Sequence, residues 1–207
     1  MKRGIFIVVD GIDGSGKSEI VKMLHNYLFS KHKKYRILTT REPTNGTYGK
    51  RIRDMLRNEK DPLSSDKKLT ELFIKDRKEH LISIMDPFLK KSNPHELNIV
   101  ICDRYYYSTI AFQGAQGIDI KSLIDKNKSF RKPDIAFILD SEPLTALKRI
   151  SYRQKEKFEQ LEFMKKIRKN FLMLPKMLKD NIKVIDSNKP LDNVFADIKN
   201  EVEKILI

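Results

Sequence analysis

The chain has few of the features that mark secreted, disulfide-bonded or membrane-spanning proteins. Its only cysteine is Cys102, which lies inside an expected core strand, so a disulfide framework and a cysteine metal site are excluded. No apolar stretch is long enough to cross a bilayer. Residues 1–4 lead directly into an apolar run and leave no room for a signal peptide. We therefore expect a cytoplasmic protein with no membrane partner.

Internal repeats and changes of composition that would mark a linker are also missing. A chain of 207 residues suits one α/β domain with a well-buried core. We expect residues 1–207 to form that single domain.

Acidic residues are outnumbered, with 28 acidic against 42 basic side chains and a formal net charge of +14. Such an excess can indicate nucleic-acid binding. The lysines, however, are spread along the chain and are not interleaved with aromatic residues in one patch. A solvated basic surface is the simpler interpretation, and we expect no nucleic-acid partner.

One glycine-rich stretch fits the phosphate-binding pattern G-x-x-x-x-G-K-[ST] without a gap. Its glycines let the backbone fold around an anion, with successive N–H groups pointing at the α and β phosphates of a nucleotide. Lys17 would reach the β and γ phosphates, and the Ser18 hydroxyl would meet the accompanying Mg²⁺. The residues expected to bind ATP here are Gly11, Ile12, Asp13, Gly14, Ser15, Gly16, Lys17 and Ser18.

The flanks of this stretch argue against a chance match. Residues 5–9 form an apolar run rich in β-branched residues, which is typical of a central parallel strand. Ile20, Val21, Leu24 and Leu28 follow at helical spacing. Strand, glycine loop and helix therefore come in the order that a P-loop requires, and Lys17 as a mere surface lysine is disfavoured.

Charged residues follow the next expected strands. Arg41, Glu42 and Pro43 come after a strand at 36–40, and ligands of open parallel sheets bind outside the carboxyl ends of strands. We expect this segment to face the same crevice as the P-loop. The alternative is a solvated turn.

A third strand is expected at 98–105, with Asp103 and Arg104 at its carboxyl end. Asp103 stands where a P-loop enzyme places a second acid associated with Mg²⁺. Arg104 would lie over the phosphates and bridge donor and acceptor groups. A simple Asp-Arg pair at the end of a strand is the alternative.

The spacing of apolar residues predicts a long amphipathic helix from Ser65 to about Lys90, capped by Ser64 or Ser65. Phe73 and Arg77 are one turn apart and could stack on a base and bond its edge. Equally, Phe73 could be a core residue and Arg77 could pair with Glu71 or Asp76 on the surface.

Two further strands, at 133–140 and 182–186, alternate with helices that begin at about residues 143, 158 and 190. Five strands alternating with helices predict a five-stranded parallel sheet wrapped by helices on both faces. Cations crowd residues 149–158, which include Arg149 and Arg153. A short lid that closes on a triphosphate is expected there, with a solvent-facing connection as the alternative.

The motifs together resemble the thymidylate kinase family over nearly the whole chain. Besides the P-loop, the matching segments are Arg41-Glu42-Pro43, Leu72-Phe73 with Arg77, Asp103-Arg104-Tyr105, Ser108-Thr109, Ala111-Phe112-Gln113-Gly114, Pro133-Asp134 and Leu139-Asp140. The resemblance implies a P-loop NTPase fold of the nucleoside-monophosphate kinase type, usually homodimeric. It also implies transfer of the γ-phosphoryl group of Mg-ATP to dTMP.

The resemblance further implies roles for individual residues. Asp13 would hold the deoxyribose 3′-OH, Phe73 would stack on thymine, Arg77 would bond the base edge, and Arg104 would clamp the acceptor phosphate. Ser108, Thr109 and Gln113 would line the base pocket, with Phe112 crowding the 2′ position, and Arg149, Asn188 and Lys189 would flank adenine.

The chain departs from the family pattern at two places. Thr44-Asn45-Gly46-Thr47 replaces Gly-Gly-Thr, and Gly14 stands where some relatives carry arginine. Relatives without that arginine supply a cation from the lid, which points to Arg153, Lys155 or Lys157. The expected catalytic groups are therefore Lys17, Arg104 and Arg153, with Ser18 and Asp103 at the metal.

Two other functions remain open from the sequence. One is another deoxynucleotide or deoxynucleoside kinase on the same fold, because only fine geometry selects the base. The other is a non-catalytic nucleotide-binding or nucleic-acid-associated P-loop protein, against which Asp13, Asp103, Arg104 and the Phe73/Arg77 pair argue.

Overall fold

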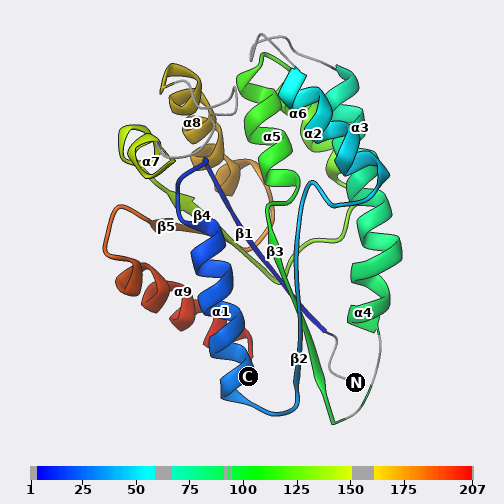
Figure 1. Ribbon diagram of the computed structural model, residues 1–207, viewed down its shortest axis with the longest axis vertical. Helices are drawn as coiled ribbons and strands as arrows, with labels where there is room; N and C mark the ends of the chain where they lie inside the picture. The colour runs from blue at the N-terminus through cyan, green and yellow to red at the C-terminus, as the bar shows by residue number, and fades with distance from the viewer. Residues whose placement is uncertain (1–3, 59–66, 91–92, 94, 151–160, 207) are drawn as a thin grey trace.

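A computed structural model describes residues 4–58, 67–90, 93, 95–150 and 161–206. Its centre is a five-stranded sheet in the order β2-β3-β1-β4-β5 (Figure 1). Every neighbouring pair of strands is parallel, which confirms the expected fold class. Parallel pairing requires a crossover between successive strands, and the helices supply it.

The strands are β1 (Ile5–Gly11), β2 (Tyr35–Arg41), β3 (Leu97–Asp103), β4 (Ile135–Asp140) and β5 (Ile182–Asp186). The helices are α1 (Lys17–Lys31), α2 (Thr47–Asn58), α3 (Lys67–His80), α4 (Asp86–Lys90), α5 (Tyr106–Ala115), α6 (Ile120–Asn127), α7 (Pro143–Ile150), α8 (Leu161–Met177) and α9 (Leu191–Ile205), with a π-helical turn, η1 (Leu81–Met85), between α3 and α4.

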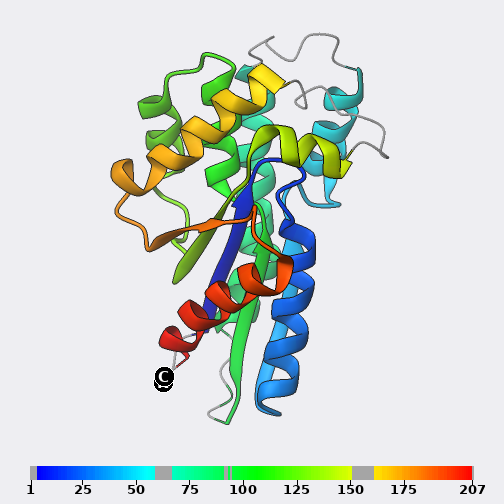
Figure 2. The ribbon, with the colours of Figure 1, turned by 90° about the vertical axis from the view of Figure 1, so that its left-hand side faces the viewer.

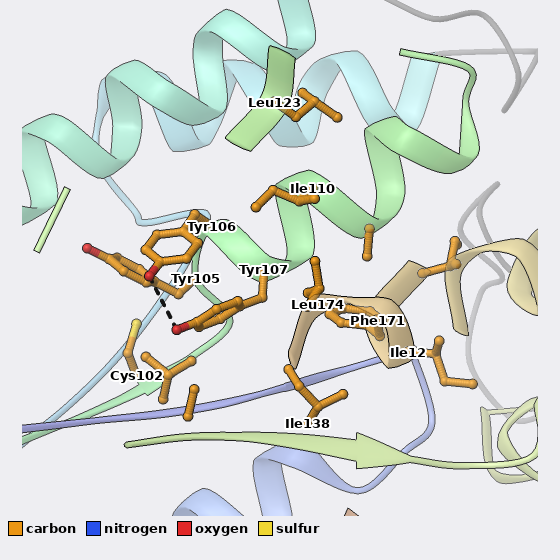
Figure 3. Close-up of a cluster of buried hydrophobic side chains, with 14 of the residues drawn as sticks. Ile12, Cys102, Tyr105, Tyr106, Tyr107, Ile110, Leu123, Ile138, Phe171 and Leu174 are labelled. Carbon is orange, nitrogen blue, oxygen red and sulfur yellow. Dashed lines mark hydrogen bonds between the residues drawn. The ribbon is translucent and has the colours of Figure 1, made fainter. Parts of the chain in front are cut away.

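Helices cover both faces of the sheet because alternate residues of each strand point to opposite sides. Ile5, Ile7 and Val9 pack with α1 and α9 in one core. Phe6 and Val8 pack with α3, α5 and α8 in the other (Figures 1 and 3). Burial on both faces explains why the central strands are continuous apolar runs and not alternating ones.

The third strand ends two residues earlier than the sequence suggests. β3 stops at Asp103, because Arg104 adopts a φ of 70° and turns the chain out of the sheet. That left-handed conformation is unfavourable for a residue with a side chain. Pro43, after β2, follows a cis peptide bond. The positive φ of Arg104 and the cis peptide bond before Pro43 both lie at the carboxyl edge of the sheet, beside the P-loop.

Two helices, α2 and α6, were not expected from the sequence. α2 packs Tyr48, Ile52, Met55 and Leu56 against the core, and α6 packs Ile120, Leu123 and Ile124 against it. Both helices therefore have a short apolar stripe that the sequence-based prediction overlooked. The long helix expected from residue 65 to 90 exists from Lys67 onward, but η1 interrupts it with i→i+5 bonding. Its expected serine cap lies outside the described residues.

Among the described residues, no helix is both long enough and apolar enough to cross a membrane.

Candidate active site

The glycine-rich loop between β1 and α1 has the backbone of a phosphate cradle. Gly11, Gly14 and Gly16 take φ values of 143°, 77° and 93°, which side-chain-bearing residues rarely adopt. α1 begins directly afterwards at Lys17, so its free N–H groups and positive dipole end lie at the loop. The sequence-based prediction of a strand, loop and helix is confirmed.

Gly14 packs directly against α7, which lies beside the loop in Figure 2. A Cβ atom at this position would lie 2.2 Å from the carbonyl oxygen of Ala146. Arg149 of the same helix donates to the Gly14 carbonyl at 3.4 Å and to the Ser187 carbonyl at 3.1 Å. The loop thus has no room for an arginine at position 14.

Lys17 is a buried cation, with 7% of its surface exposed. Its Nζ donates to the Ile12 carbonyl at 2.6 Å and lies 4.0 Å from an Asp13 oxygen. Burial, together with the nearby Arg104 charge, lowers the pKa of Lys17 to about 8, although Asp13 and Asp103 oppose the change. A phosphate group placed here would favour the ammonium form of Lys17 and raise its pKa again.

Ser18 and Asp103 come together as expected for a magnesium site. The Ser18 hydroxyl donates to Asp103 Oδ2 at 3.1 Å. The other Asp103 oxygen, Oδ1, is buried and has no hydrogen-bond partner. A hydroxyl and a carboxylate with an uncommitted oxygen suit Mg²⁺, which takes few protein ligands and completes its shell with phosphates and water.

Arg104 connects the P-loop with α5. Its guanidinium donates to the Ser108 hydroxyl at 2.9 Å, to the Gly11 carbonyl at 3.3 Å and to the Asp13 carboxylate. It also lies over the Phe112 ring, with 5.3 Å between Cζ and the ring centroid. Arg104 is therefore fixed between the nucleotide loop and the expected acceptor pocket.

Asp10, which the sequence reasoning missed, holds this arrangement from beneath. Its carboxylate accepts from the backbone N–H groups of Gly11, Tyr105 and Ser108 at 2.8, 3.1 and 3.0 Å, and from the Ser108 hydroxyl at 2.6 Å. Burial raises its pKa, although Arg104 and these hydrogen bonds oppose the change. Its place directly before the P-loop was the available signal.

The pKa of Asp13 is shifted in the opposite direction to that of Asp10. Burial alone would raise its pKa, but the Arg104 and Lys17 cations outweigh burial and hold the pKa below its usual value. The side chain keeps 31% of its surface exposed. Asp13 is thus an ionised carboxylate with an accessible face, as the predicted contact with a sugar hydroxyl requires.

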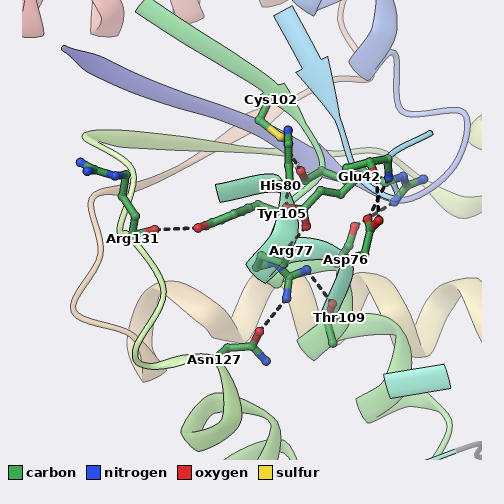
Figure 4. A network of polar contacts seen from close by, with 12 residues as sticks. Glu42, Asp76, Arg77, His80, Cys102, Tyr105, Thr109, Asn127 and Arg131 are labelled. Carbon is green, nitrogen blue, oxygen red and sulfur yellow. Dashed lines mark hydrogen bonds and ion pairs between the residues drawn. The ribbon is translucent and has the colours of Figure 1, made fainter. Parts of the chain in front are cut away.

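Arg77 lies in a buried polar network, shown in Figure 4. It pairs with Glu42 at 2.9 Å and also donates to Thr109 and Asn127. The alternative surface pair with Glu71 or Asp76 is therefore wrong, since Asp76 instead accepts from the Thr44 backbone and hydroxyl. The true partners could not be read from nearby positions in the sequence, because they come from the segment after β2, from α5 and from α6.

Other expected acceptor residues surround Arg77 and Arg104. Gln113 is 2% exposed, and its Oε1 has no hydrogen-bond partner. Phe73 and Phe112 are partly buried against the α5 side of the core. Arg41 is exposed, and the carboxylate of Glu42 turns inward to Arg77 and His80. Glu42 thus supports the pocket and does not project into it.

The expected adenine-side residues follow β4 and β5. The Asn188 side chain accepts from the Glu142 backbone at 2.8 Å and donates to Asp186 at 2.8 Å, so it joins the two loops. Arg149 reaches from α7 to the same place. Lys189 pairs with Asp197 of α9 at 3.2 Å. The lid residues Arg153, Lys155 and Lys157 lie outside the described residues.

The parallel sheet has a P-loop at its centre, with Ser18 and Asp103 beside it and Arg104 joining the loop to α5. This arrangement defines a P-loop phosphotransferase of nucleoside-monophosphate kinase architecture. Residues 9–198 match the family model described as thymidylate kinase. The chain belongs to the thymidylate kinase family.

Relatives of known name match the chain over nearly its whole length. It is 34% identical to the probable thymidylate kinase of Thermococcus gammatolerans, over 99% of this chain and 98% of that protein. It is 36% identical to the thymidylate kinase of Desulfotalea psychrophila, over 98% and 96%. It is 35% identical to the thymidylate kinase of Clostridium novyi, over 96% and 98%.

The contact between Gly14 and α7 makes a stability prediction. Gly117 has a similar φ, 94°, but open space around it, so Gly117→Ala should cost only the backbone strain, about 1 to 2 kcal/mol. Gly14→Ala adds the clash with Ala146 and should cost clearly more. Urea unfolding of both variants without nucleotide measures the difference, and equal losses would contradict the proposed contact.

The lowered pKa of Lys17 makes a second prediction. Between pH 8 and 10 the free protein holds Lys17 partly neutral, whereas bound phosphates favour the ammonium form, so ATP binding should take up a proton. ATP affinity should therefore fall as the pH rises through about 8. Calorimetry at pH 8.5 in buffers of different ionisation enthalpy measures the uptake. Lys17→Met is the control, and equal uptake in both proteins would disprove the assignment.

Proposed function

We propose that the protein transfers the γ-phosphoryl group of Mg-ATP to dTMP, giving dTDP and ADP, as a step in dTTP synthesis. The observation that carries the proposal is Arg104, whose guanidinium contacts both the P-loop and α5. Membership of the thymidylate kinase family and the names of the relatives support dTMP as the acceptor.

Charge neutralisation is the main task in phosphoryl transfer. Lys17 binds the β and γ phosphates, and Arg104 balances charge between donor and acceptor. A lid cation, Arg153 in our proposal, completes the set, because Gly14 cannot be replaced by arginine without moving α7. Ser18 and Asp103 hold Mg²⁺, which supplies further positive charge at the phosphates. No residue needs to act as a general base.

The acceptor roles that we propose are those implied by the family resemblance. Asp13 binds the 3′-OH of the sugar, Phe73 stacks on the base, and Arg77 donates to the base edge. Residues that line the rest of this pocket are Arg41, Pro43, Ser108, Thr109, Phe112 and Gln113, with Glu42 behind Arg77. On the donor side, Arg149 and the Asn188-Lys189 loop flank adenine.

We also propose a homodimer that works in the cytoplasm, where ATP is supplied. Exposed apolar side chains on η1 support a partner surface, since Ile82 and Ile84 are 61% and 44% exposed. Sedimentation equilibrium of the purified chain tests the assembly, and a monomer at micromolar concentration would exclude it.

An acceptor panel tests the proposed reaction. ADP release is measured with Mg-ATP and dTMP, dUMP, dCMP, dGMP, UMP or thymidine, and we expect a strong preference for dTMP. Lys17→Ala should lower turnover by about a hundredfold or more with the fold intact.

Each other outcome of the panel has a distinct meaning. Preference for another monophosphate or for thymidine would leave the ATP site intact and overturn the acceptor assignment. ATP binding without turnover on any acceptor would favour the non-catalytic P-loop protein. Near-normal activity of Lys17→Ala would overturn the role of the P-loop.

A further inference from the structure

Arg77 makes more contacts than its buried ion pair with Glu42 alone. Its side chain is 1% exposed, and the guanidinium lies over the Tyr105 and Phe130 rings, with Cζ 5.2 and 5.6 Å from their centroids. Its edges are bound as well, by Glu42 at Nε (2.9 Å), Asn127 at Nη1 (2.6 Å) and Thr109 at Nη2 (2.9 Å). Two aromatic contacts and three hydrogen bonds therefore hold the guanidinium of Arg77 in place.

Among the described residues, these contacts leave two N–H groups of Arg77 for a ligand. A guanidinium has five N–H donors, and the three contacts use one on each nitrogen. One donor therefore remains on Nη1 and one on Nη2. Two donors at fixed positions in a buried site can recognise a carbonyl edge, because a ligand that lacks the carbonyl leaves them unsatisfied.

Glu42 fixes only one side of the guanidinium. Its other oxygen meets His80 Nδ1 at 3.1 Å, and His80 Nε2 meets the Thr40 hydroxyl at 2.8 Å (Figure 4). This chain of contacts runs from Nε back to β2. The Nη1 side is held by Asn127 alone among the described residues.

Asn127 is itself preset for this contact. It is the last residue of α6 and is 3% exposed. Its Nδ2 donates to the Leu123 carbonyl of the preceding turn at 2.7 Å, so its Oδ1 is directed to Arg77. The amide is neutral, which means that it orients the guanidinium without adding a charge to the pair formed by Arg77 and Glu42.

We propose that Asn127 is a positioning residue which, through Arg77, sets how strictly the site selects an acceptor base with a carbonyl edge. The proposal rests on the proposed function insofar as Arg77 faces the base. It assigns to α6, through the hydrogen bond from Arg77 to Asn127, a role in substrate selection.

The positioning itself is measured without turnover. Side-chain ¹⁵N spectra of arginine report rotation about the Nε–Cζ bond, and the wild-type Arg77 should give separate, slowly exchanging Nη signals. Asn127→Ala should bring these signals into exchange, whereas Asn127→Asp, which keeps the acceptor oxygen, should preserve them. Leu123→Ala is the matched control, since Leu123 is fully buried in the same helix but its side chain does not bond Arg77.

Kinetics measures the consequence for selection. Asn127→Ala should raise the KM for dTMP about tenfold, because the loss of binding free energy should be about that of one hydrogen bond to a charged group. The kcat and the KM for ATP should stay nearly unchanged. The preference for dTMP over dCMP, which has an amino group in place of the 4-carbonyl, should fall by a similar factor. Asn127→Asp should restore both values, and Leu123→Ala should alter neither.

Unchanged Nη exchange in Asn127→Ala would overturn the positioning role. Altered exchange with an unchanged preference for dTMP would overturn the role in selection, as would an equal effect of Leu123→Ala. A wild-type protein that does not phosphorylate dTMP would instead refute the proposed function, while the NMR comparison would still decide whether Asn127 positions Arg77.

Discussion

The buried carboxylate of Asp10 is the interaction on which the rest of the site depends. It stands at the carboxyl end of β1 and binds the first N–H of the P-loop together with two N–H groups at the start of α5. α5 has no side-chain cap from its N-cap residue, and this carboxylate accepts from N–H groups at the start of the helix, where Ser108 N–H also donates to the Tyr105 carbonyl. The nucleotide loop and the acceptor helix are thereby fixed to one strand.

The charged groups around Asp10 would be balanced more fully by a bound phosphate group. Lys17 and Arg104 are both largely buried, and the two positive charges repel each other, which contributes to the lowered pKa of Lys17. Asp13 and Asp103 compensate in part, and Asp103 keeps a buried oxygen without a partner. A cluster of this kind is costly in the free protein and favourable once anions and a divalent cation enter. In the proposed function, the same residues would both bind nucleotides and stabilise the transition state.

The sequence predicted the parts of the site that depend on local order. The P-loop, the five parallel strands and the meeting of Ser18 with Asp103 all follow from strand ends that converge at one edge of the sheet. The contacts of Arg77 could not be predicted, because its partners Glu42 and Asn127 are 35 and 50 residues away. The helix that carries Asn127 is short, and its apolar stripe of Ile120, Leu123 and Ile124 was overlooked in the sequence. Arg104 does lie between the P-loop and α5, but the turn that it makes at the end of β3 depends on the packing around it.

The central claim is that donor and acceptor nucleotides meet in one crevice, over Arg104. An inhibitor in which adenosine and thymidine are joined through their 5′ positions by a chain of five phosphates tests this directly. We expect it to compete with both ATP and dTMP in steady-state kinetics and to bind with a stoichiometry of one per chain. Competition with ATP alone, with inhibition that excess dTMP does not relieve, would contradict the account.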